Sequence, residues 1–474
     1  MGIPNENNRV LVIGLDGATW DLLDPWIEAG KLPNLAKLAN SGCRGKLGSV
    51  FPIISLAAWS SFSTGMTPGK HGVFGFQQRN RPDYKSYIPM STDVKGKWFW
   101  ETIGMSGKRS IIINVPGTYP PRELNGVLVS GLLATKTVTY PPELADGLAL
   151  KGYTVDEKGY FNTSKGGFLE DIYGTTDSMA KAGLEFLENE DWDVFVIVFT
   201  GTDRIQTCMW EDKAGMLKYF QRMDSIVGEF AEKAGNNTTT FVVSDHGAGR
   251  LKRKFFVDTW LKEQGYLKLL KSSDTPVKKA AVFIASFLRT TKLVETIRRV
   301  ILFFGLRPSS VIRRPTLDID IANSKAFSSS YYESGVYINR NLVTGNDYEK
   351  IRDEIIGKLK SVKDPESGKT VIKNIFKADV LYKNPVSDAP DILIEAAEDY
   401  TVAGGMRSAL LFEQSVRDTG THKFDGIFMA SGKGIKSGQK IDDISIVDVA
   451  PTILRLFGMR SKEMDGKIIE EIFE

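Results

Sequence analysis

The chain has 474 residues, of which 42% are hydrophobic and 25% are charged, and its formal net charge is +3. This is the composition of an ordinary soluble globular protein, and it excludes the strongly basic signature of a nucleic-acid-binding chain. We therefore expect no specific binding of nucleic acid. The length allows two or three domains, or one large α/β domain with insertions.

Cysteine usage and the apolar runs indicate the cell compartment. Cys43 and Cys208 are too few for a disulfide framework and form no Cys-x-x-Cys pair, so a reducing compartment is expected. Residues 1–9 lack the basic and apolar regions of a signal peptide. The longest apolar runs, at 194–199 and 300–304, are far shorter than the ~20 residues that span a bilayer. We expect a cytoplasmic protein.

The first predicted element is a strand over 10–15, where a continuous apolar run is followed by Asp16 and Gly17. Such a run is typical of a strand buried on both faces of a parallel sheet. Asp16 would lie at the carboxyl end of this strand, where open α/β sheets bind their ligands. A helix is expected next, over 32–39, ended by Gly42.

The stretch that follows is poor in charge and rich in hydroxyl groups. After the turn at Pro52, apolar residues recur at roughly helical spacing, at Leu56, Trp59 and Phe62. Ser55 would therefore stand where a loop enters a helix, beside unpaired N–H groups and the positive end of the helix dipole. That setting suits a phosphate-like anion. The alternative is that Ser55 merely caps the helix, because serine is a favoured N-cap residue.

Further short apolar runs predict strands, at 110–115, 193–199, 240–243, 325–327, 335–339 and 391–394. Asp203 follows the second of these runs, and Asp245 and His246 follow the third. Together with Asp16, these side chains would meet at one edge of a sheet. Packing alone does not explain acidic residues at three strand ends.

Residues 277–314 differ from the rest of the chain, because they carry nine basic residues against the single acid Glu295, interleaved with apolar residues. The pattern predicts two basic amphipathic helices in an insertion over 266–319, with 1–265 and 320–474 forming the α/β core. The helices could contact an anionic membrane surface or act as a lid that attracts an anionic substrate. The alternative is an insertion that packs on its apolar face and exposes a solvated basic surface.

Two features close the chain. Residues 418–422 form a polar, glycine-containing loop that includes His422. Residues 442–458 predict a final amphipathic helix capped by Gly458.

The chain has three histidines, His71, His246 and His422. Carboxylates and imidazoles gathered at one sheet edge are the ligands that divalent transition metals require, zinc in particular. A metal beside Ser55 would lower the pKa of its hydroxyl, so that the oxygen could attack as an alkoxide. His71 lies in a Gly-Lys-His-Gly segment after the predicted helix, and we interpret it as a structural turn histidine.

Several motifs occur in a defined order along the chain, namely Leu15-Asp16-Gly17, the Phe51-Pro52 turn before Ser55, Thr64-Gly65 with Pro68-Gly69-Lys70-His71-Gly72, Thr202-Asp203-Arg204, Ser244-Asp245-His246-Gly247 and Thr421-His422. Together they resemble the alkaline phosphatase superfamily and, within it, the type I phosphodiesterase/nucleotide pyrophosphatase family. The resemblance covers residues 10 to about 260 and about 325 to 458, which leaves the basic insertion outside it. It implies an α/β fold with a doubly wound, mostly parallel sheet flanked by helices.

The resemblance also implies two metal ions bridged by the reacting phosphate, and a covalent phosphoserine at Ser55. The two metal sites would be formed by Asp16, Ser55, Asp245 and His246, and by Asp203 and His422. Zinc is the expected ion, with manganese or magnesium as alternatives at the Asp203 site. The implied substrate is a small phosphorylated molecule, either a nucleotide or a phosphodiester.

Two positions depart from the family pattern. Family members usually have a histidine four residues after the Asp of Thr202-Asp203-Arg204, on the same helix face, where this chain has Thr207. Cys208 or Asp212 could replace that ligand, although residue 208 points roughly 100° away around a helix. Phe76 stands where many nucleotide pyrophosphatases have an asparagine that binds the phosphate, so nucleotide specificity is not implied.

The expected function is that of a metal-dependent phosphoric ester hydrolase, a phosphodiesterase or nucleotide pyrophosphatase. A sulfatase is disfavoured, because the segment at Ser55 lacks the Cys/Ser-x-Pro-x-Arg pattern. The alternatives are a phosphomonoesterase, a phosphonate hydrolase, a transferase to a lipid acceptor, or a homologue that only binds a phosphorylated ligand, which Thr207 would favour. Peripheral contact with an anionic membrane would use 277–314, and the oligomeric state does not follow from the sequence.

Overall fold

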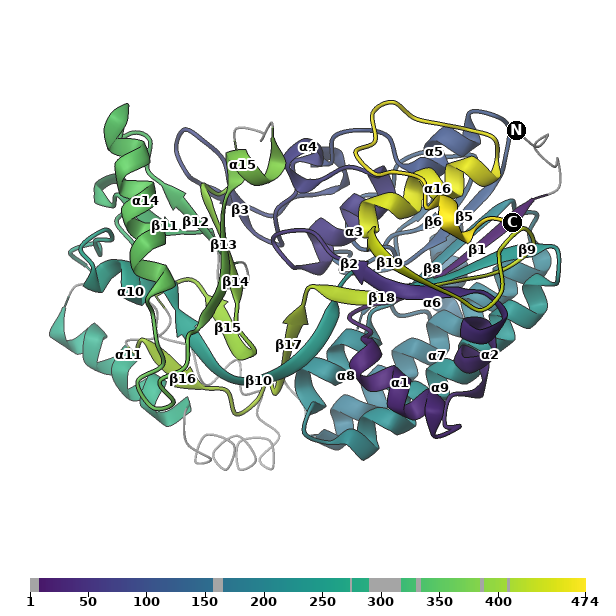
Figure 1. Cartoon of the computed structure of the whole chain (residues 1–474), viewed down its shortest axis with the longest axis horizontal. Coiled ribbons are helices and arrows are strands. Elements are labelled where there is room, and N and C mark those ends of the chain that lie inside the picture. The colour runs from purple at the N-terminus through teal and green to yellow at the C-terminus, as the bar shows by residue number, and fades with distance from the viewer. Residues whose placement is uncertain are drawn as a thin grey trace.

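The computed structural model describes residues 8–156, 165–272, 275–289, 317–329, 334–383, 388–406 and 410–474. They form a large lobe built on a nine-stranded sheet and a smaller lobe built on short strands, which lie side by side (Figure 1). The first described strand, β1 (Arg9–Leu15), and the C-terminus both lie on the large lobe. The predicted α/β class with a mostly parallel central sheet is confirmed.

The central sheet contains all three strands that were predicted to end in acidic residues. Its strands are, in spatial order, β19 (Gln439–Ser445), β2 (Cys43–Gly48), β18 (Asp425–Gly432), β9 (Thr238–Val243), β1 (Arg9–Leu15), β8 (Val194–Phe199), β5 (Ser110–Ile113), β6 (Gly126–Val129) and β7 (Thr139–Tyr140). The five strands from β9 to β6 run parallel, whereas β18 and β7 are antiparallel to their neighbours in this series. The carboxyl ends of β1, β8 and β9 therefore meet at one edge.

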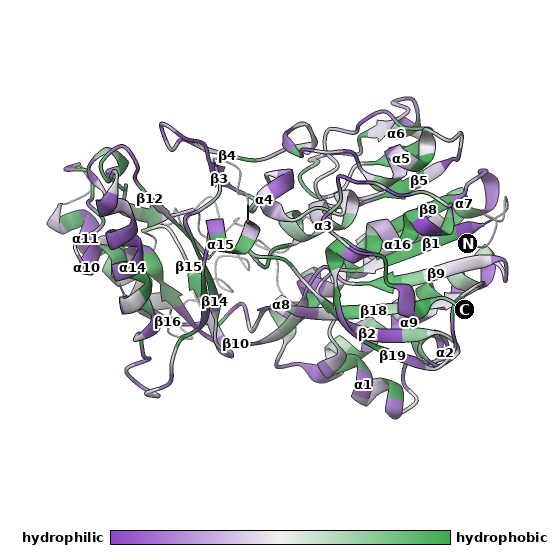
Figure 2. Cartoon of the chain, turned by 45° about the horizontal axis from the view of Figure 1, so that its top comes forward, coloured by the Kyte–Doolittle hydropathy of each residue, from purple (hydrophilic) through white to green (hydrophobic). Residues whose placement is uncertain are grey.

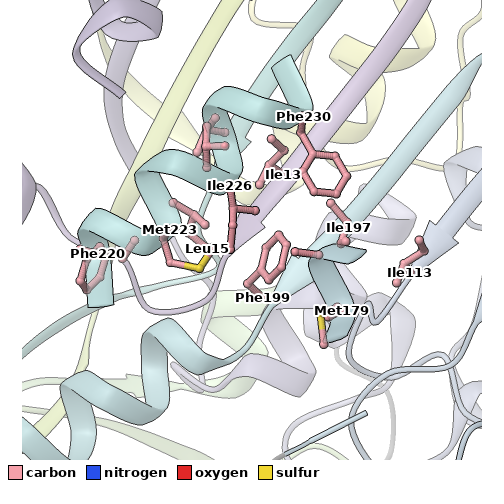
Figure 3. Close-up of a cluster of buried hydrophobic side chains, with 14 of the residues drawn as sticks. Ile13, Leu15, Ile113, Met179, Ile197, Phe199, Phe220, Met223, Ile226 and Phe230 are labelled. Carbon is pink, nitrogen blue, oxygen red and sulfur yellow. The ribbon is translucent and has the colours of Figure 1, made fainter. Parts of the chain in front are cut away.

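Each central strand is buried on both faces, which explains its continuous apolar sequence. In β1, Leu11, Ile13 and Leu15 enter one hydrophobic core, whereas Val10 and Val12 enter the core on the other side. The first of these cores continues into the aromatic and methionine side chains of the covering helices (Figure 3). Figure 2 shows the central strands mostly in the hydrophobic colour, with hydrophilic residues on the outer parts of the helices.

Helices cover both faces of the central sheet, as in a doubly wound fold. The core with Leu11 is covered by α1 (Trp20–Glu28), α2 (Pro33–Ser41), α6 (Leu144–Leu150), α7 (Lys165–Asn189), α8 (Gly201–Met209) and α9 (Lys213–Ala234). The core with Val10 is covered by α3 (Ser55–Thr64), α5 (Phe99–Gly104) and α16 (Val449–Leu456). A short helix, α4 (Pro68–His71), follows α3 and contacts it.

The smaller lobe has its own hydrophobic core between short strands and helices. One antiparallel sheet contains β11 (Ala326–Ser328), β12 (Gly335–Ile338), β14 (Ile392–Ala396) and β13 (Ile372–Lys377). A second sheet contains β15 (Asp399–Ala403), β10 (Gly247–Phe256), β16 (Phe412–Gln414) and β17 (Gly420–Lys423). The helices of this lobe are α10 (Val257–Glu263), α11 (Pro276–Arg289), α14 (Asn346–Lys360) and α15 (Ala378–Tyr382), and a hairpin of β3 (Gln78–Arg79) and β4 (Ser86–Tyr87) packs against it.

One strand joins the two lobes. β10 begins directly after His246 at the edge of the central sheet and ends at Phe256 in the core of the smaller lobe (Figure 1). Its first four residues pair with β17, and its last residues pair with β15 and β16. The strand therefore links the candidate site to the smaller lobe by a continuous hydrogen-bonded backbone.

The prediction of a helix over 442–458 is wrong in its first part. Residues up to Ser445 belong to β19, whose Ile441 and Ile444 pair with β2, and only Val449–Leu456 form the helix. The buried Ile441 and Ile444 are three residues apart because a bulge places two exposed residues between them, and this spacing resembles that of a helix.

Of the predicted insertion over 266–319, the structure describes 266–272, 275–289 with α11, and 317–319. Val282 on this helix is buried in the core of the smaller lobe, whereas Val277 is 80% exposed and Phe283 is 50% exposed. The predicted second helix lies outside the described residues, so the boundaries of the insertion stay a prediction. In the part of the chain that the structure describes, no helix combines the length and apolar character needed to cross a membrane.

Candidate active site

All six residues predicted for the site lie together at the carboxyl edge of the central sheet. Asp16 follows β1, Asp245 and His246 follow β9, and Asp203 lies in the first turn of α8, directly after β8. Ser55 is the first residue of α3, and His422 lies in β17, opposite Ala248 of β10. The predicted meeting of these side chains at one edge is therefore observed.

The Ser55 hydroxyl faces the site and does not cap its helix. The N-cap of α3 is Ile54, which has an extended backbone and no capping side-chain hydrogen bond. The Ser55 Oγ lies 3.3 Å from the Asp16 Oδ1 and 3.2 Å from the His246 Nε2, and the residue is 5% exposed. The alternative of a simple helix cap is excluded by this geometry.

A first group of possible metal ligands contains Asp16, Asp245 and His246, all of them buried. The His246 Nε2 lies 3.3 Å from the Asp245 Oδ2 and 3.7 Å from the Asp16 Oδ1. The buried Asp245 Oδ2 has no hydrogen-bond partner. Three converging ligand atoms, one of them an orphaned carboxylate oxygen, fit a divalent cation.

A second group contains Asp203, His246 and His422. The His422 Nε2 lies 3.4 Å from the Asp203 Oδ1, and the two imidazole rings stack with centroids 3.9 Å apart. The Nδ1–H of His246 donates to the Gly247 carbonyl at 3.0 Å, and that of His422 donates to the Ile53 carbonyl at 3.1 Å. Because a carbonyl only accepts, the Nδ1 of each imidazole carries a proton, and the neutral form of each ring presents an Nε2 lone pair to a metal ion.

Burial and mutual charge set the protonation of these ligands. Burial, together with the charges of Asp245 and Asp203, raises the pKa of Asp16 well above its ordinary value. Burial lowers the pKa of His246, which favours the neutral form that binds a metal ion. Burial opposes ionisation of Asp203, but its hydrogen bond and charge interaction with His422 hold its pKa below the usual range. A cation here would relieve the repulsion among the carboxylates.

A sequence model of the type I phosphodiesterase/nucleotide pyrophosphatase family matches residues 10–425. The chain belongs to this family. It is a phosphoric ester hydrolase, and its superfamily depends on divalent metal ions. No curated protein sequence matches the chain.

Solved structures of the superfamily share this fold at low sequence identity. Human ectonucleotide pyrophosphatase/phosphodiesterase 5 has a TM-score of 0.59 and 14% identity, with 98% of this chain and 100% of that chain covered. The murine protein of the same name, as an inactive variant in complex with AMP, has a TM-score of 0.59 and 13% identity over the same shares of both chains. Phosphonoacetate hydrolase from Sinorhizobium meliloti, in complex with phosphonoformate, has a TM-score of 0.60 and 13% identity, with 94% of each chain covered.

Two groups that hold the ligands of this phosphodiesterase-family site were not apparent from the sequence. The Trp59 Nε1–H donates to the Asp16 Oδ2 at 3.1 Å, and the Gly17 N–H donates to the Asp245 Oδ1 at 3.1 Å. Trp59 lies one turn after Ser55 on α3, and that i, i+4 spacing was the available signal. Gly17 has a φ of +69°, and a Cβ there would lie 3.2 Å from the Asp203 side chain, so the turn requires glycine.

The family's usual histidine position is occupied by Thr207, as the sequence indicated. The Thr207 Oγ1 donates to the Asp203 Oδ1 at 3.4 Å. Asp212 caps α9 by accepting from the Gly215 N–H at 2.9 Å, and Cys208 is half-buried against the hydrophobic core of the sheet. Neither residue belongs to the ligand groups found among the described residues, so neither replaces the histidine.

His71 has a structural role, which confirms its interpretation. The residue is fully buried at the end of α4, where its Nδ1 accepts from the Val73 N–H at 3.1 Å. Its Nε2–H donates to the Ser61 Oγ at 2.9 Å. Burial lowers the pKa of His71 from 6.5 to about 3.

This depressed pKa predicts a pH-dependent contribution to stability. Between pH 6.5 and about 3, the unfolded chain binds a proton on His71 that the folded chain does not. The free energy of unfolding should therefore lose up to about 1.4 kcal/mol per pH unit through this group as the pH falls from 6.5. Urea unfolding of the wild type and of His71→Gln from pH 7.5 to 4.5 measures it.

The difference in unfolding free energy between these two proteins should shrink as the pH falls, because glutamine does not titrate. Titration of His246 and His422 is common to both proteins and cancels in the comparison. A difference that stays constant over this pH range would contradict the prediction.

Proposed function

We propose that the protein cleaves phosphodiesters or nucleotide pyrophosphate bonds through a covalent phosphoserine on Ser55. The observation that carries the proposal is the Ser55 hydroxyl, 3.3 Å from Asp16 and 3.2 Å from His246 at the start of a ten-residue helix. A buried hydroxyl that faces a carboxylate and an imidazole is in a setting that activates a nucleophile.

The proposal includes two divalent cations. Their ligands would be Asp16, Ser55, Asp245 and His246 for the first ion, and Asp203 and His422 for the second. The orphaned Asp245 Oδ2 supports this assignment, as does the Nε2 of each histidine, which faces the carboxylates of its group. Zinc is the proposed ion, with manganese or magnesium as alternatives at the Asp203 site. When bound, the cations would lower the pKa of the Ser55 hydroxyl and stabilise charge on the phosphoryl oxygens.

In the first step, the Ser55 Oγ forms a bond to phosphorus while the bond to the leaving oxygen opposite it breaks. The first N–H groups of α3 have no acceptor within the helix, so they are available to the phosphoryl oxygens beside Ser55. In the second step, water displaces the Ser55 Oγ from phosphorus and restores the hydroxyl. Before the first step, Asp16 and His246 position the serine hydroxyl by their contacts with its oxygen.

We propose a small phosphorylated substrate and assign no nucleobase preference. AMP bound to the murine relative supports the phosphorylated class. Phe76, at the position of the family's phosphate-binding asparagine, is half-buried against Leu56, the neighbour of Ser55. Its ring has no group that could donate to phosphate, so the phosphate must be bound by the other groups of the site.

Comparison of three substrates tests the proposal. With the protein dialysed against zinc or manganese, bis(4-nitrophenyl) phosphate should be cleaved faster than 4-nitrophenyl phosphate, and phosphonoacetate should not be cleaved. A faster monoester reaction would instead favour a phosphomonoesterase, and release of phosphate from phosphonoacetate would favour a phosphonate hydrolase. A protein that binds one metal ion and turns over none of the three would be a ligand-binding homologue.

The cytoplasmic location and the membrane contact of 277–314 stay predictions. The exposed Val277 and Phe283 support a contact surface on α11. Sedimentation with vesicles of anionic lipid, compared with neutral lipid, tests it, because a basic membrane-binding segment would bind only the anionic vesicles.

A further inference from the structure

The two candidate metal groups share one side chain. His246 belongs to both groups, and its Nδ1–H is committed to the Gly247 carbonyl. Only the Nε2 lone pair is left, and one lone pair binds one metal ion. Two ions bound at the same time must therefore divide the ligands unequally.

The first group retains the better set of ligands. The His246 Nε2 contacts three atoms of this group, the Ser55 Oγ at 3.2 Å, the Asp245 Oδ2 at 3.3 Å and the Asp16 Oδ1 at 3.7 Å. With His246, the group offers an imidazole, two buried carboxylates and a hydroxyl. The second group, without His246, keeps only Asp203 and His422.

Thr207 does not replace the ligand that the second group loses. It lies one helical turn after Asp203 on α8, so its side chain is on the same face, and its Oγ1 is 3.4 Å from the Asp203 Oδ1. A neutral hydroxyl is a much poorer ligand for a transition metal than an imidazole. The position that could complete the second group therefore carries a weak ligand.

Arg204 weakens the second group further. Its Nη1 lies 3.4 Å from the Asp203 Oδ2. The guanidinium competes with a metal ion for the Asp203 carboxylate, and its positive charge repels the ion. Among the described residues, Asp16 and Asp245 form no ion pair with an arginine or a lysine, so no guanidinium competes for the carboxylates of the first group.

We infer that the protein retains one ion tightly at the Asp16 group and binds a second ion weakly and exchangeably at the Asp203 group. The inference rests on the proposed function. A phosphate anion would supply oxygens that the second ion lacks, so phosphate and the second ion should each strengthen the binding of the other. Turnover would then follow the free concentration of divalent metal.

Isothermal titration calorimetry of the metal-free protein with manganese tests the inference by measuring the affinity of each site. The wild type should show two sites whose dissociation constants differ by about 100-fold or more. The reason is that the second group offers two side-chain ligands where the first group offers four. Thr207→His should tighten the second site about 10-fold or more and leave the first unchanged. Thr207→Val, the control of equal shape, should leave the first site as it is and the second no tighter.

A wild-type titration with inorganic phosphate adds a measurement that needs no variant. Phosphate should tighten the second site and leave the first unchanged. Two wild-type sites of equal affinity would overturn the inference, as would a second site whose affinity is changed neither by phosphate nor by Thr207→His. These results would leave the proposed function standing, whereas a wild type that binds no manganese or zinc at all would overturn the proposed function itself. An unchanged first site shows that Thr207→His is folded.

Discussion

Ser55→Ala is expected to reduce turnover of a phosphodiester by about four orders of magnitude or more, because removal of a nucleophile leaves only the catalysis due to binding and charge stabilisation. The Ser55 Oγ is the hydroxyl oxygen in contact with both Asp16 and His246. Steady-state kinetics with bis(4-nitrophenyl) phosphate measures the loss. Binding of manganese should persist, since Asp16, Asp245 and His246 remain.

A second serine on the same helix provides a matched control. The Ser63 Oγ donates to the Trp59 carbonyl at 2.8 Å within α3 and is as buried as Ser55. Ser63→Ala removes the same atom from the same element, and its turnover should stay close to that of the wild type. Wild-type turnover in Ser55→Ala would refute the assignment of the nucleophile.

Trp59→Phe is expected to weaken metal binding at the Asp16 group about 10- to 100-fold, the usual effect of losing a hydrogen bond that orients a ligand. The indole Nε1–H is lost, so the Asp16 Oδ2 loses the donor at 3.1 Å that fixes its orientation. Isothermal titration with manganese measures the affinity. Because Trp59 is fully buried, the smaller ring should also lower the free energy of unfolding, by about 1–3 kcal/mol.

Trp100→Phe separates these two effects. Trp100 is fully buried in the same hydrophobic core as Trp59, but its Nε1 has no hydrogen-bond partner. The substitution removes the same volume without removing a hydrogen bond to the site. It should lower stability to a similar degree and leave metal affinity unchanged. Equal metal affinity in Trp59→Phe and the wild type would contradict the role given to Trp59.

The catalytic edge of the sheet could be predicted from the sequence because its signals are local. The strand over 10–15 and the two strands before Asp203 and Asp245 are continuous apolar runs, which only a strand buried on both faces tolerates. The carboxyl ends of parallel strands necessarily share an edge. Ser55 followed from a turn and a helical repeat that are also local.

Other parts of the site depend on contacts between distant residues. His422 was expected in a polar loop and entered the site only through the resemblance, because β17 forms by pairing with β10, more than 160 residues earlier. The spacing of the apolar residues placed Trp59 on the apolar face of its helix, but it did not indicate which group accepts the hydrogen bond from its N–H. The strands at 325–327, 335–339 and 391–394 were predicted, but the separate core of the smaller lobe that they form was not, because it is assembled from short elements in distant parts of the chain.

β10 has a mechanical consequence. It starts beside His246, pairs with the strand that carries His422, and continues into the core of the smaller lobe. A rotation of that lobe would displace the backbone of both histidines through the hydrogen-bonded strand. A binder raised against the outer surface of the smaller lobe would therefore change catalysis without touching the active site.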